Sequence, residues 1–283
     1  MPAQNETTRF APSPSGFLHL GHAYSALLNA DIARKSGGRM QLRIEDIDRG
    51  RCKAQFEDAI YEDLAWLGLS WPEPVMRQAD RFAVYEQALA RLAAEGLLYR
   101  CFKTRAELSA LAGAPHGKAE DAARLTAPLP ASEEQKLIAD GAPFAWRLNA
   151  AAAAAKLGKA NITWTEQSQT GVTEHSAPLD QLADDVLARK DFPVSYHLAS
   201  VIDDAAQDIS FVLRGEDLKP FIPLHRVLQD LLGLPAPRYG HHHLIKDASG
   251  RRLAKRDRAA TLRARRQAGA TAEDIRQQLD LSP

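Results

Sequence analysis

The chain has 283 residues, of which 45% are hydrophobic, and its acidic and basic residues balance to a net charge of zero. This length and apolar content can form a large core in one to three domains. The balanced charge excludes a chain that is a polycation throughout, and the sequence has no run of about 18 apolar residues that could cross a membrane.

The N-terminus and the cysteine content indicate a cellular compartment. Residues 1–6 do not combine a charged segment with an apolar one, so a secretory signal is not expected. Cys52 and Cys101 are the only cysteines, and two are too few for a disulfide framework. We therefore expect a cytoplasmic protein with no membrane segment.

The N-terminal part of the sequence alternates between strand and helix patterns. Short strands are expected at 9–11 and at 40–44, where apolar and polar residues alternate in the second case. Apolar residues at helical spacing predict helices from about Gly21, over 56–67 and over 82–92. Strands and helices that alternate in this way predict a parallel sheet with crossover helices.

The rest of the chain divides into an irregular middle and a second regular part. Residues from about 100 to 190 are Ala-rich and weakly periodic, apart from a strand expected at 162–165, which indicates an insertion. The regular pattern then resumes with strands at 196–202, 209–213 and 241–245, and a helix at 224–231. Thr271 is the expected N-cap of a last helix.

The first candidate site lies at the start of the first predicted helix. His19, Gly21 and His22 follow a Pro/Ser/Gly turn at 12–16. Gly21 lets a ligand lie against the helix start, where free N–H groups and the helix dipole favour phosphate. The two imidazoles lie three positions apart and can donate hydrogen bonds to phosphate oxygens. Taken alone, this pattern could also form an ordinary turn.

A basic loop far along the chain is the second candidate element. Between Arg251 and Arg266 the sequence has eight basic residues against one acidic residue, which suits phosphate or nucleic acid. Lys255 in this loop can reach a nucleotide's phosphates and neutralise charge as pyrophosphate leaves. The alternative for this loop is a solvated basic surface.

Together these two elements resemble the HIGH and KMSKS signatures of class I aminoacyl-tRNA synthetases. The resemblance points to the glutamyl branch of that family because it extends to residues 9–16, 43–48, 196–199 and 213–218. Two positions depart from the KMSKS pattern, since Arg252 and Ala254 stand where the family has Lys and Ser. Lys255, the second lysine of the pattern, is retained.

The resemblance implies a fold and a division of the chain. The fold would be α/β, with a Rossmann-type, doubly wound parallel sheet split by a smaller inserted α+β domain. Residues 1–98 and 191–240 would form the two halves of this catalytic core, and residues 99–190 the insertion. Residues 241–283 would hold the KMSKS-like loop and a helical segment. ATP would bind at the carboxyl ends of the strands.

The resemblance also assigns roles to individual residues. His19, Gly21 and His22 would bind the ATP phosphates, with Mg²⁺ on those phosphates. Lys255 would also bind ATP and stabilise the transition state, so that His19, His22 and Lys255 would be the catalytic residues. The positions that match the family's glutamate-binding residues are Arg9, Ala11, Ser13, Glu45, Tyr196 and Arg214.

The residue types at these positions suit a dicarboxylic amino acid. Arg9 and Arg214 offer planar guanidinium forks that match carboxylates, and Glu45 offers a carboxylate to the α-ammonium group. The Ser13 and Tyr196 hydroxyls can add hydrogen bonds. Arg9 and Glu45 could instead be held in intramolecular ion pairs, and Tyr196 could be a core aromatic residue with a satisfied hydroxyl.

A metal site is not expected. Related enzymes carry a Cys-x-Cys pair for zinc in the insertion, but here Lys103 stands two positions after Cys101, and a protonated lysine cannot ligate zinc. Structural zinc normally takes four ligands, and no third cysteine follows. Residues 241–243 are consecutive histidines, but on a strand their side chains would point alternately to opposite faces.

The acceptor of the glutamyl group depends most on the resemblance. Twenty-seven residues follow Arg256, which is fewer than an anticodon-binding domain needs. A shortened glutamyl-type core resembles the branch that attaches L-glutamate to the queuosine base in the anticodon loop of tRNA(Asp), and we expect a monomer. The phosphates of the RNA would be gripped by Arg258, Arg263, Arg265 and Arg266. Two alternatives remain, a truncated enzyme that charges tRNA(Glu) and a non-catalytic regulator that binds a nucleotide or RNA.

Overall fold

The computed structural model of the protein describes most of the chain, namely residues 5–104, 106–108, 127–168, 170–245 and 261–281. The predicted KMSKS-like loop, with Arg252, Ala254 and Lys255, lies outside these residues, as does Arg258. Among the described helices none is both long enough and apolar enough to cross a membrane.

The N-terminal part of the chain, which is the first half of the predicted core, forms a three-stranded parallel sheet in the order β1-β2-β3. Its elements are, in chain order, β1 (Thr7–Phe10), α1 (Leu20–Lys35), β2 (Arg39–Ile44), α2 (Ala54–Trp66), β3 (Met76–Arg77), a 3-10 turn (Gln78–Asp80) and α3 (Phe82–Ala94). In the register of β1 and β2, Thr7 lies opposite Arg39 and Phe10 opposite Leu42. The predicted alternation of strands and helices around a parallel sheet is confirmed.

The second half adds strands in the same orientation. Its elements are α8 (Tyr196–Ala206), β9 (Phe211–Gly215), a 3-10 turn (Glu216–Phe221), α9 (Ile222–Leu232) and β10 (Arg238–His242). Strand β10 pairs in parallel with β9 on one side and with β6 (Asn161–Ser168) on the other. Strand β6 also forms an antiparallel hairpin with β7 (Gly171–Pro178) at the edge of this sheet.

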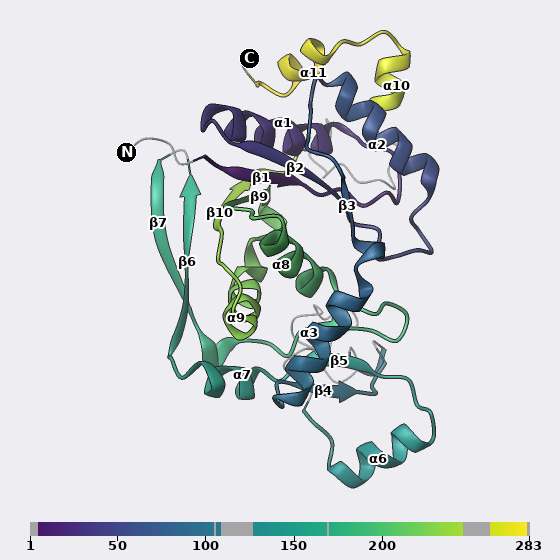
Figure 1. The fold of residues 1–283 in the computed structure, drawn as a ribbon, viewed down its shortest axis with the longest axis vertical. Coiled ribbons are helices and arrows are strands. Elements are labelled where there is room, and N and C mark those ends of the chain that lie inside the picture. Colours follow the sequence, from purple (N-terminus) through teal and green to yellow (C-terminus); the bar gives the residue numbers. More distant parts are fainter. Residues whose placement is uncertain (1–4, 105, 109–126, 169, 246–260, 282–283) are drawn as a thin grey trace.

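Strands β1 and β9 lie side by side and join the two halves (Figure 1). The Ser210 N–H donates to the Thr7 carbonyl at 3.0 Å, and the Thr7 N–H donates to the Ser210 hydroxyl at 2.9 Å. Farther along β9, the Leu213 carbonyl accepts from the side chains of Arg9 and Asn29, both at 3.3 Å. The order of strands thus reverses between β1 and β9, and in open α/β sheets such a switch point is where ligands bind.

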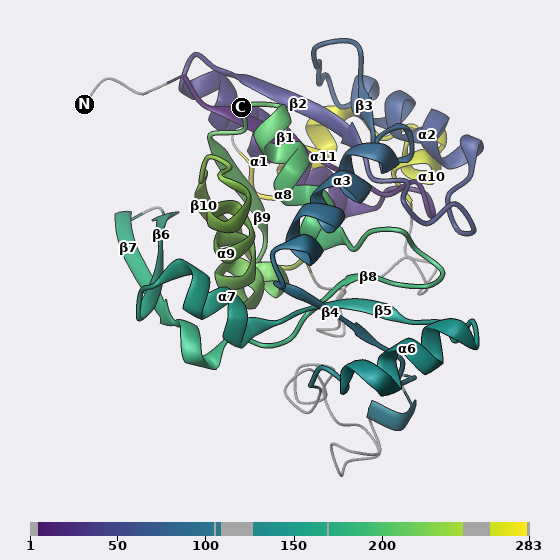
Figure 2. The same cartoon turned by 60° about the horizontal axis from the view of Figure 1, so that its bottom comes forward.

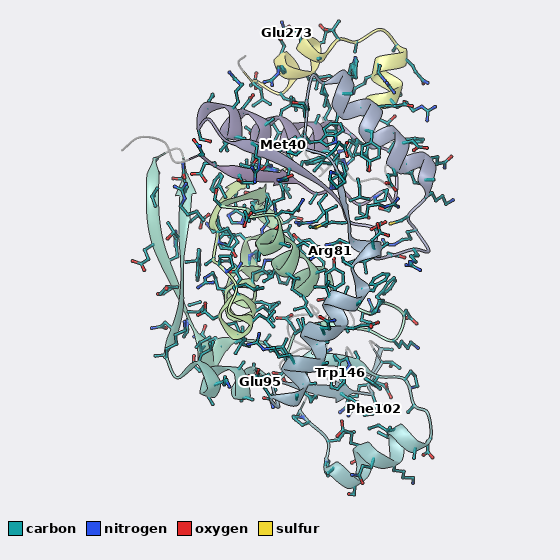
Figure 3. All side chains as sticks on the ribbon, in the orientation of Figure 1. Met40, Arg81, Glu95, Phe102, Trp146 and Glu273 are labelled. Atoms are coloured by element: carbon teal, nitrogen blue, oxygen red, sulfur yellow. The ribbon has the colours of Figure 1, made fainter. Side chains whose placement is uncertain are left out.

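The middle of the chain builds a small antiparallel sheet at the far end of the molecule (Figure 2). Its elements and neighbours are β4 (Leu98–Cys101), α6 (Ala131–Ala139), β5 (Ala145–Leu148), α7 (Ala150–Leu157) and β8 (Val186–Ala188). Trp146 (Figure 3) lies on β5, and the Arg100 guanidinium lies over its ring, 4.5 Å from the centroid. Since β6 also falls within 99–190 and pairs with β10, the boundaries of the inserted domain stay a prediction.

Residues 196–202 form the first part of helix α8, so the prediction of a strand there is wrong. The Ser195 hydroxyl accepts from the Leu198 N–H at 3.4 Å and caps the helix. Buried side chains then recur at helical spacing and pack into the same core as α9, namely Leu198, Ala199, Val201 and Ile202. A short apolar run does not distinguish strand from helix by periodicity alone.

Most other predicted elements are found near their expected positions. Strand β6 contains residues 162–165, and helix α9 contains residues 224–231, as predicted. Strand β9 begins two residues later than expected, at Phe211. Strand β10 lies earlier than the predicted 241–245, since it begins at Arg238 and ends at His242.

The C-terminal segment forms two short helices that pack on the first half of the chain (Figure 1). They are α10 (Leu262–Gln267) and α11 (Ala272–Gln278). Thr271 is the N-cap of α11, as predicted, and its hydroxyl accepts from the Asp274 N–H at 3.1 Å. Buried side chains of this segment join the core beneath α1 and α2, namely Leu262, Ile275 and Leu279.

Arg81, the residue before α3 (Figure 3), forms an ion pair with Asp203 of α8. The Arg81 Nε donates to Asp203 Oδ1 at 2.8 Å, and the Asp203 side chain is fully buried. The Tyr85 hydroxyl and the Gln78 amide donate to the other Asp203 oxygen. Helix α8 is therefore fixed by polar as well as apolar contacts, which matters because it forms one wall of the site.

Candidate active site

A cavity of about 520 Å³ lies at the carboxyl ends of β1, β2, β9 and β10, beside the start of α1. This is the switch point between β1 and β9, where the fold favours ligand binding. Every residue predicted to bind ATP or glutamate in the described part of the chain lines this cavity, namely Arg9, Ala11, Ser13, His19, Gly21, His22, Glu45, Tyr196 and Arg214. Lys255, the remaining predicted site residue, lies outside the described residues.

Helix α1 begins at the cavity with two histidines in its first turn. His19 is the N-cap, and its Nδ1 accepts from the Gly21 N–H at 3.1 Å, while the His22 Nδ1 accepts from the His19 N–H at 3.2 Å. Because each Nδ1 is an acceptor, each neutral imidazole carries its proton on Nε2. A Cβ on Gly21 would lie 3.1 Å from the His19 Cε1, so glycine avoids a tight contact with that ring at the cavity. This helix start suits a phosphate group.

A cluster of buried charged side chains forms the wall on the side of β1, β2 and α8. The fully buried Arg43 donates to Asp204 at 2.7 Å, to Gln207 at 3.0 Å and to Glu45 at 3.1 Å. The Arg9 Nε donates to the same Asp204 oxygen at 3.1 Å. Arg9 and Glu45 therefore do form intramolecular ion pairs, with Asp204 and Arg43 as their partners, and both also line the cavity.

Burial and neighbouring charges oppose each other in this cluster. Burial raises the pKa of Glu45, and the charges of Arg43 and Arg9 only partly offset that rise. Burial also acts to raise the pKa of Asp204, but Arg9 and Arg43 outweigh it, so that this pKa lies below its ordinary value. The carboxylate of Asp204 is therefore ionised, as a buried charge can be when it is paired.

Neutral partners hold Arg214 on the side of β9 and α9. Its Nη1 lies 3.1 Å from the His225 Nδ1, and its Nη2 donates to the Leu218 carbonyl at 3.1 Å. The His225 Nε2 in turn lies 3.0 Å from the His197 Nδ1. Burial and then the charge of Arg214 lower the pKa of His197 to about 4 and that of His225 well below its ordinary value. Both imidazoles are thus neutral at neutral pH.

The turn after β1 and the start of α8 supply the other predicted residues. The Glu45 N–H donates to the Pro12 carbonyl at 3.0 Å, which holds this turn against the end of β2. The Ser13 Oγ lies 3.7 Å from the Cys52 Sγ. Tyr196 lines the cavity with its ring edge-on to His197, at a centroid distance of 5.4 Å. The roles of these side chains toward glutamate stay predictions.

The three consecutive histidines point to different surroundings. The His241 Nδ1 lies 2.9 Å from Glu166 Oε1, His242 lines the cavity, and the His243 Nδ1 lies 3.4 Å from the Tyr24 hydroxyl. Within the described ranges, no group of three or more His, Cys, Asp or Glu side chains could hold a metal ion. The expectation that the protein carries no zinc stays a prediction.

The predicted phosphate-gripping arginines near the C-terminus contact the chain itself. Their partners are the Phe17 ring for Arg263, the Gln278 side chain for Arg265, and the Glu62 carboxylate for Arg266. The contacts of Arg263 and Arg266 hold the C-terminal segment on the N-terminal part of the chain, and that of Arg265 joins α10 to α11, so a role in gripping RNA gains no support from them.

Several residues of the cavity wall were missed in the sequence. They are Phe10, Pro12, Ser25, Leu213, Gly215, Asp217, Leu218, His242, Leu244 and Ile245. His242 is the last residue of β10, Leu244 and Ile245 follow it, and Asp217 follows the end of β9. Since the strands of a parallel sheet end at one edge, the residues at and just after a strand end are a signal for such positions, but the predicted strand at 241–245 placed that end too late to reveal the last three.

Comparison with known proteins agrees with this geometry. Residues 6–279 match the family described as tRNA synthetases class I (E and Q), catalytic domain. The chain is 43% identical over 97% of its length to the glutamyl-Q tRNA(Asp) synthetase of Rhodobacter capsulatus and covers 99% of that protein. It is 41% identical over 94% of its length to the protein of the same name from Nocardia farcinica, of which it covers 81%.

A solved structure shares the fold. The glutamate-tRNA synthetase from Elizabethkingia anophelis matches 90% of the chain with a TM-score of 0.72 and 28% identity. The chain spans about half the length of that structure, since it covers 53% of it. The family match over nearly all residues and the shared fold give the same answer: the chain belongs to the class I tRNA synthetases for glutamate and glutamine and matches their catalytic domain.

Proposed function

We propose that this enzyme uses ATP to activate L-glutamate and transfers the glutamyl group to the queuosine base in the anticodon loop of tRNA(Asp). The observation that supports this most directly is one cavity lined by Arg9, Arg214 and Glu45 together with His19 and His22. The two arginines and the glutamate match the charges of a dicarboxylic amino acid, and the helix start beside the two histidines suits a triphosphate. Similarity to two proteins named glutamyl-Q tRNA(Asp) synthetase, covered over 99% and 81% of their lengths, supports this acceptor.

The proposed ATP site is the start of α1. The Nε2–H groups of His19 and His22 would donate to phosphate oxygens, and the backbone at Gly21 would allow the phosphates to approach. Lys255 would add a positive charge from its loop as pyrophosphate leaves. ATP would arrive with Mg²⁺ on its phosphates, because proteins usually bind this ion through substrate phosphates and only one or two carboxylates.

The proposed glutamate site lies between the two arginine-bearing walls. Arg214 and Arg9 would bind carboxylates of the substrate, and Glu45 would accept from its α-ammonium group. The ion pair between Glu45 and Arg43 uses Oε1, and a carboxylate has a second oxygen that can accept. Ser13 and Tyr196 would add hydrogen bonds from their hydroxyls, and the small side chain of Ala11 would leave room.

The proposed reaction needs no nucleophile from the protein. A carboxylate oxygen of glutamate attacks the α-phosphorus of ATP, the bond to the β-phosphate oxygen breaks, and glutamyl-adenylate and pyrophosphate form. A hydroxyl of the queuosine base then attacks the carbonyl carbon of this mixed anhydride, losing its proton, and AMP leaves. Catalysis is therefore a matter of positioning the reactants and stabilising charge.

The first step is tested by glutamate-dependent exchange of pyrophosphate into ATP without any tRNA. We expect exchange with glutamate, and much less with aspartate or glutamine. Lack of exchange with all three amino acids, in a preparation that is folded by circular dichroism, would favour the alternative of a non-catalytic nucleotide- or RNA-binding regulator.

The acceptor is tested by loading labelled glutamate onto purified tRNAs. We expect label on tRNA(Asp) that carries queuosine, and none on tRNA(Asp) that lacks the modified base. Loading of tRNA(Glu) instead would establish the other alternative, a glutamate–tRNA ligase, which the fold shared with such an enzyme makes the natural second candidate.

A further inference from the structure

We infer that His225 and His197 are positioning residues that hold the Arg214 guanidinium at the cavity without neutralising its charge. The inference rests on the proposed function, and it adds how the site distinguishes a carboxylate from a neutral group on its amino acid. It follows from the direction of two hydrogen bonds, from burial, and from the charges near Arg214.

The direction of the hydrogen bonds is fixed by Arg214. A guanidinium can only donate, so the contact of 3.1 Å makes the His225 Nδ1 an acceptor. A neutral imidazole that accepts at Nδ1 carries its proton on Nε2, and from there His225 donates to the His197 Nδ1 at 3.0 Å. His197 must then carry its own proton on Nε2. One cation thus sets the tautomers of two histidines in series.

Packing holds this chain of three side chains in place. His225 is 3% exposed and Arg214 is 5% exposed, so neither can turn toward bulk water. The His197 ring lies against the Phe221 ring, with 4.5 Å between the centroids. Protonation of either histidine would break the series and place another charge beside Arg214, and both burial and Arg214 oppose it.

The surroundings of Arg214 leave its charge for a ligand. In the described part of the chain no carboxylate forms an ion pair with it, and the partners of its two terminal nitrogens are the neutral His225 ring and the Leu218 carbonyl. Its Nε–H is buried and has no hydrogen-bond partner there. A substrate carboxylate would therefore meet an oriented, largely buried cation that is not already in an ion pair, and charge-assisted hydrogen bonds are strong in such surroundings. An Asp or Glu in place of His225 would compete with that carboxylate.

The test compares His225→Asn with His225→Asp. These two side chains have the same shape and both offer an oxygen near the position of Nδ1, but only the aspartate brings a negative charge. In glutamate-dependent pyrophosphate exchange, we expect the KM for glutamate to be about tenfold higher in the Asp variant than in the Asn variant, which corresponds to about 1.4 kcal/mol. The KM for ATP should be the same in both variants, because the helix start at His19 is unchanged.

A second readout is the choice between glutamate and glutamine. The ratio of kcat/KM for the two amino acids should fall in the Asp variant and stay high in the Asn variant, because glutamine has no charge for Arg214 to recognise. If His225 only filled space, the two variants would impair the enzyme equally and leave this ratio unchanged. Equal glutamate KM values in the two variants would overturn the inference.

A second pair of variants decides the question if substitutions at the buried His225 prevent folding. His197 is only half-buried, and Asn and Leu at this position have similar shapes, but only Asn offers an acceptor to the His225 Nε2–H. We expect a higher glutamate KM for His197→Leu than for His197→Asn, and equal values would overturn the inference. If the unaltered enzyme showed no glutamate-dependent exchange, the proposed function itself would fail, which is a separate outcome.

Discussion

The two arginines that face the cavity are held in opposite ways. Arg9 shares one oxygen of Asp204 with Arg43, at 3.1 Å and 2.7 Å, and Glu45 completes this buried group of charges. Arg214 contacts a neutral imidazole and a backbone carbonyl instead. The first wall holds two cations and two carboxyl groups in contact, whereas the second holds a cation that forms no ion pair in the described part of the chain.

This difference separates stability from recognition. A buried ion pair that loses one partner leaves an uncompensated charge, which costs stability, so the balanced wall is sensitive to any change of charge. An unbalanced cation favours an anionic ligand, so the other wall is suited to recognising the substrate. Substitutions of Asp204 and Arg43, which support the first wall without lining the cavity, should therefore change the free energy of unfolding, and substitutions on the second wall should change affinity for glutamate.

The largest effect is expected for Asp204→Asn on the balanced wall. This change removes the negative charge shared by Arg9 and Arg43, and the Arg43 side chain is fully buried. Breaking a buried pair in this way typically costs about 3–5 kcal/mol, so we expect a decrease of that size in the free energy of unfolding. Urea unfolding at neutral pH, followed by circular dichroism, measures it.

Asp208→Asn provides the matched control for this substitution. Asp208 follows the same helix and is exposed, and its backbone φ of 52° is one that asparagine tolerates. The same chemical change should therefore leave the free energy of unfolding nearly unaltered at this position. If the two variants were equally stable, the balanced wall would not depend on its charges.

The next largest effect is expected for Arg214→Ala, on affinity. A charge-assisted hydrogen bond contributes about 1.5–3 kcal/mol, so the KM for glutamate should rise about tenfold or more. Arg214→Lys keeps the charge but loses the planar fork and its contact with His225. The KM of the Lys variant for glutamate should therefore lie between those of the unaltered enzyme and the Ala variant. Pyrophosphate exchange at varied glutamate measures both, and an unchanged KM in the Ala variant would contradict the role of Arg214.

The sequence predicts the residues that line the cavity better than the buried residues that hold them in place. Every residue predicted to bind ATP or glutamate in the described part of the chain lines one cavity, because the motifs fall at strand ends and helix starts. The residues behind them escape such patterns. Asp204 is 195 positions away from Arg9 in the chain, and only the tertiary fold brings the two together.

The wrong prediction of a strand where helix α8 lies explains in part why the sequence did not reveal these supporting residues. Read as a strand, residues 196–202 put alternate side chains on opposite faces, and nothing then indicates that Asp203 and Asp204 turn inward. The buried Arg43 is similar, since a strand pattern does not show which of its charged residues lies in the core. His225 lies in a correctly predicted helix, but its contact with Arg214 depends on how α9 packs beside β9.

The imidazoles should make the second wall sensitive to acid. The pKa of His197 is about 4 in the folded chain against an ordinary 6.5, because its partial burial and then the charge of Arg214 disfavour the protonated ring. At pH values between these two pKa values, His197 is protonated in the unfolded chain but neutral in the folded chain. The free energy of unfolding therefore falls as the pH falls. The contribution of this residue is at most about 1.4 kcal/mol per pH unit. Urea unfolding at a series of pH values below neutral measures the slope.

Two variants separate this effect from other titrations. His197→Asn removes the titrating ring, so its stability should fall less steeply with acid than that of the unaltered chain. Asp63 acts in the opposite direction, because burial raises its pKa to about 6 and the folded chain then takes up a proton before the unfolded chain does. Asp63→Asn should therefore make the loss steeper, and identical slopes in all three proteins would contradict the assignment.

The smallest effect is expected away from both walls, at the ion pair that holds α11 on α1. Arg276 donates to the two oxygens of Asp31 at 3.1 Å and 3.2 Å, with side chains 17% and 11% exposed. Pairs near the surface contribute about 0.2–1 kcal/mol, so Arg276→Ala should lower the free energy of unfolding by no more than about 1 kcal/mol. Urea unfolding and pyrophosphate exchange on the same preparation should show this loss with an unchanged KM for glutamate. A raised KM here would mean that any loss of stability loosens the cavity, and stability and recognition could then no longer be assigned to separate walls.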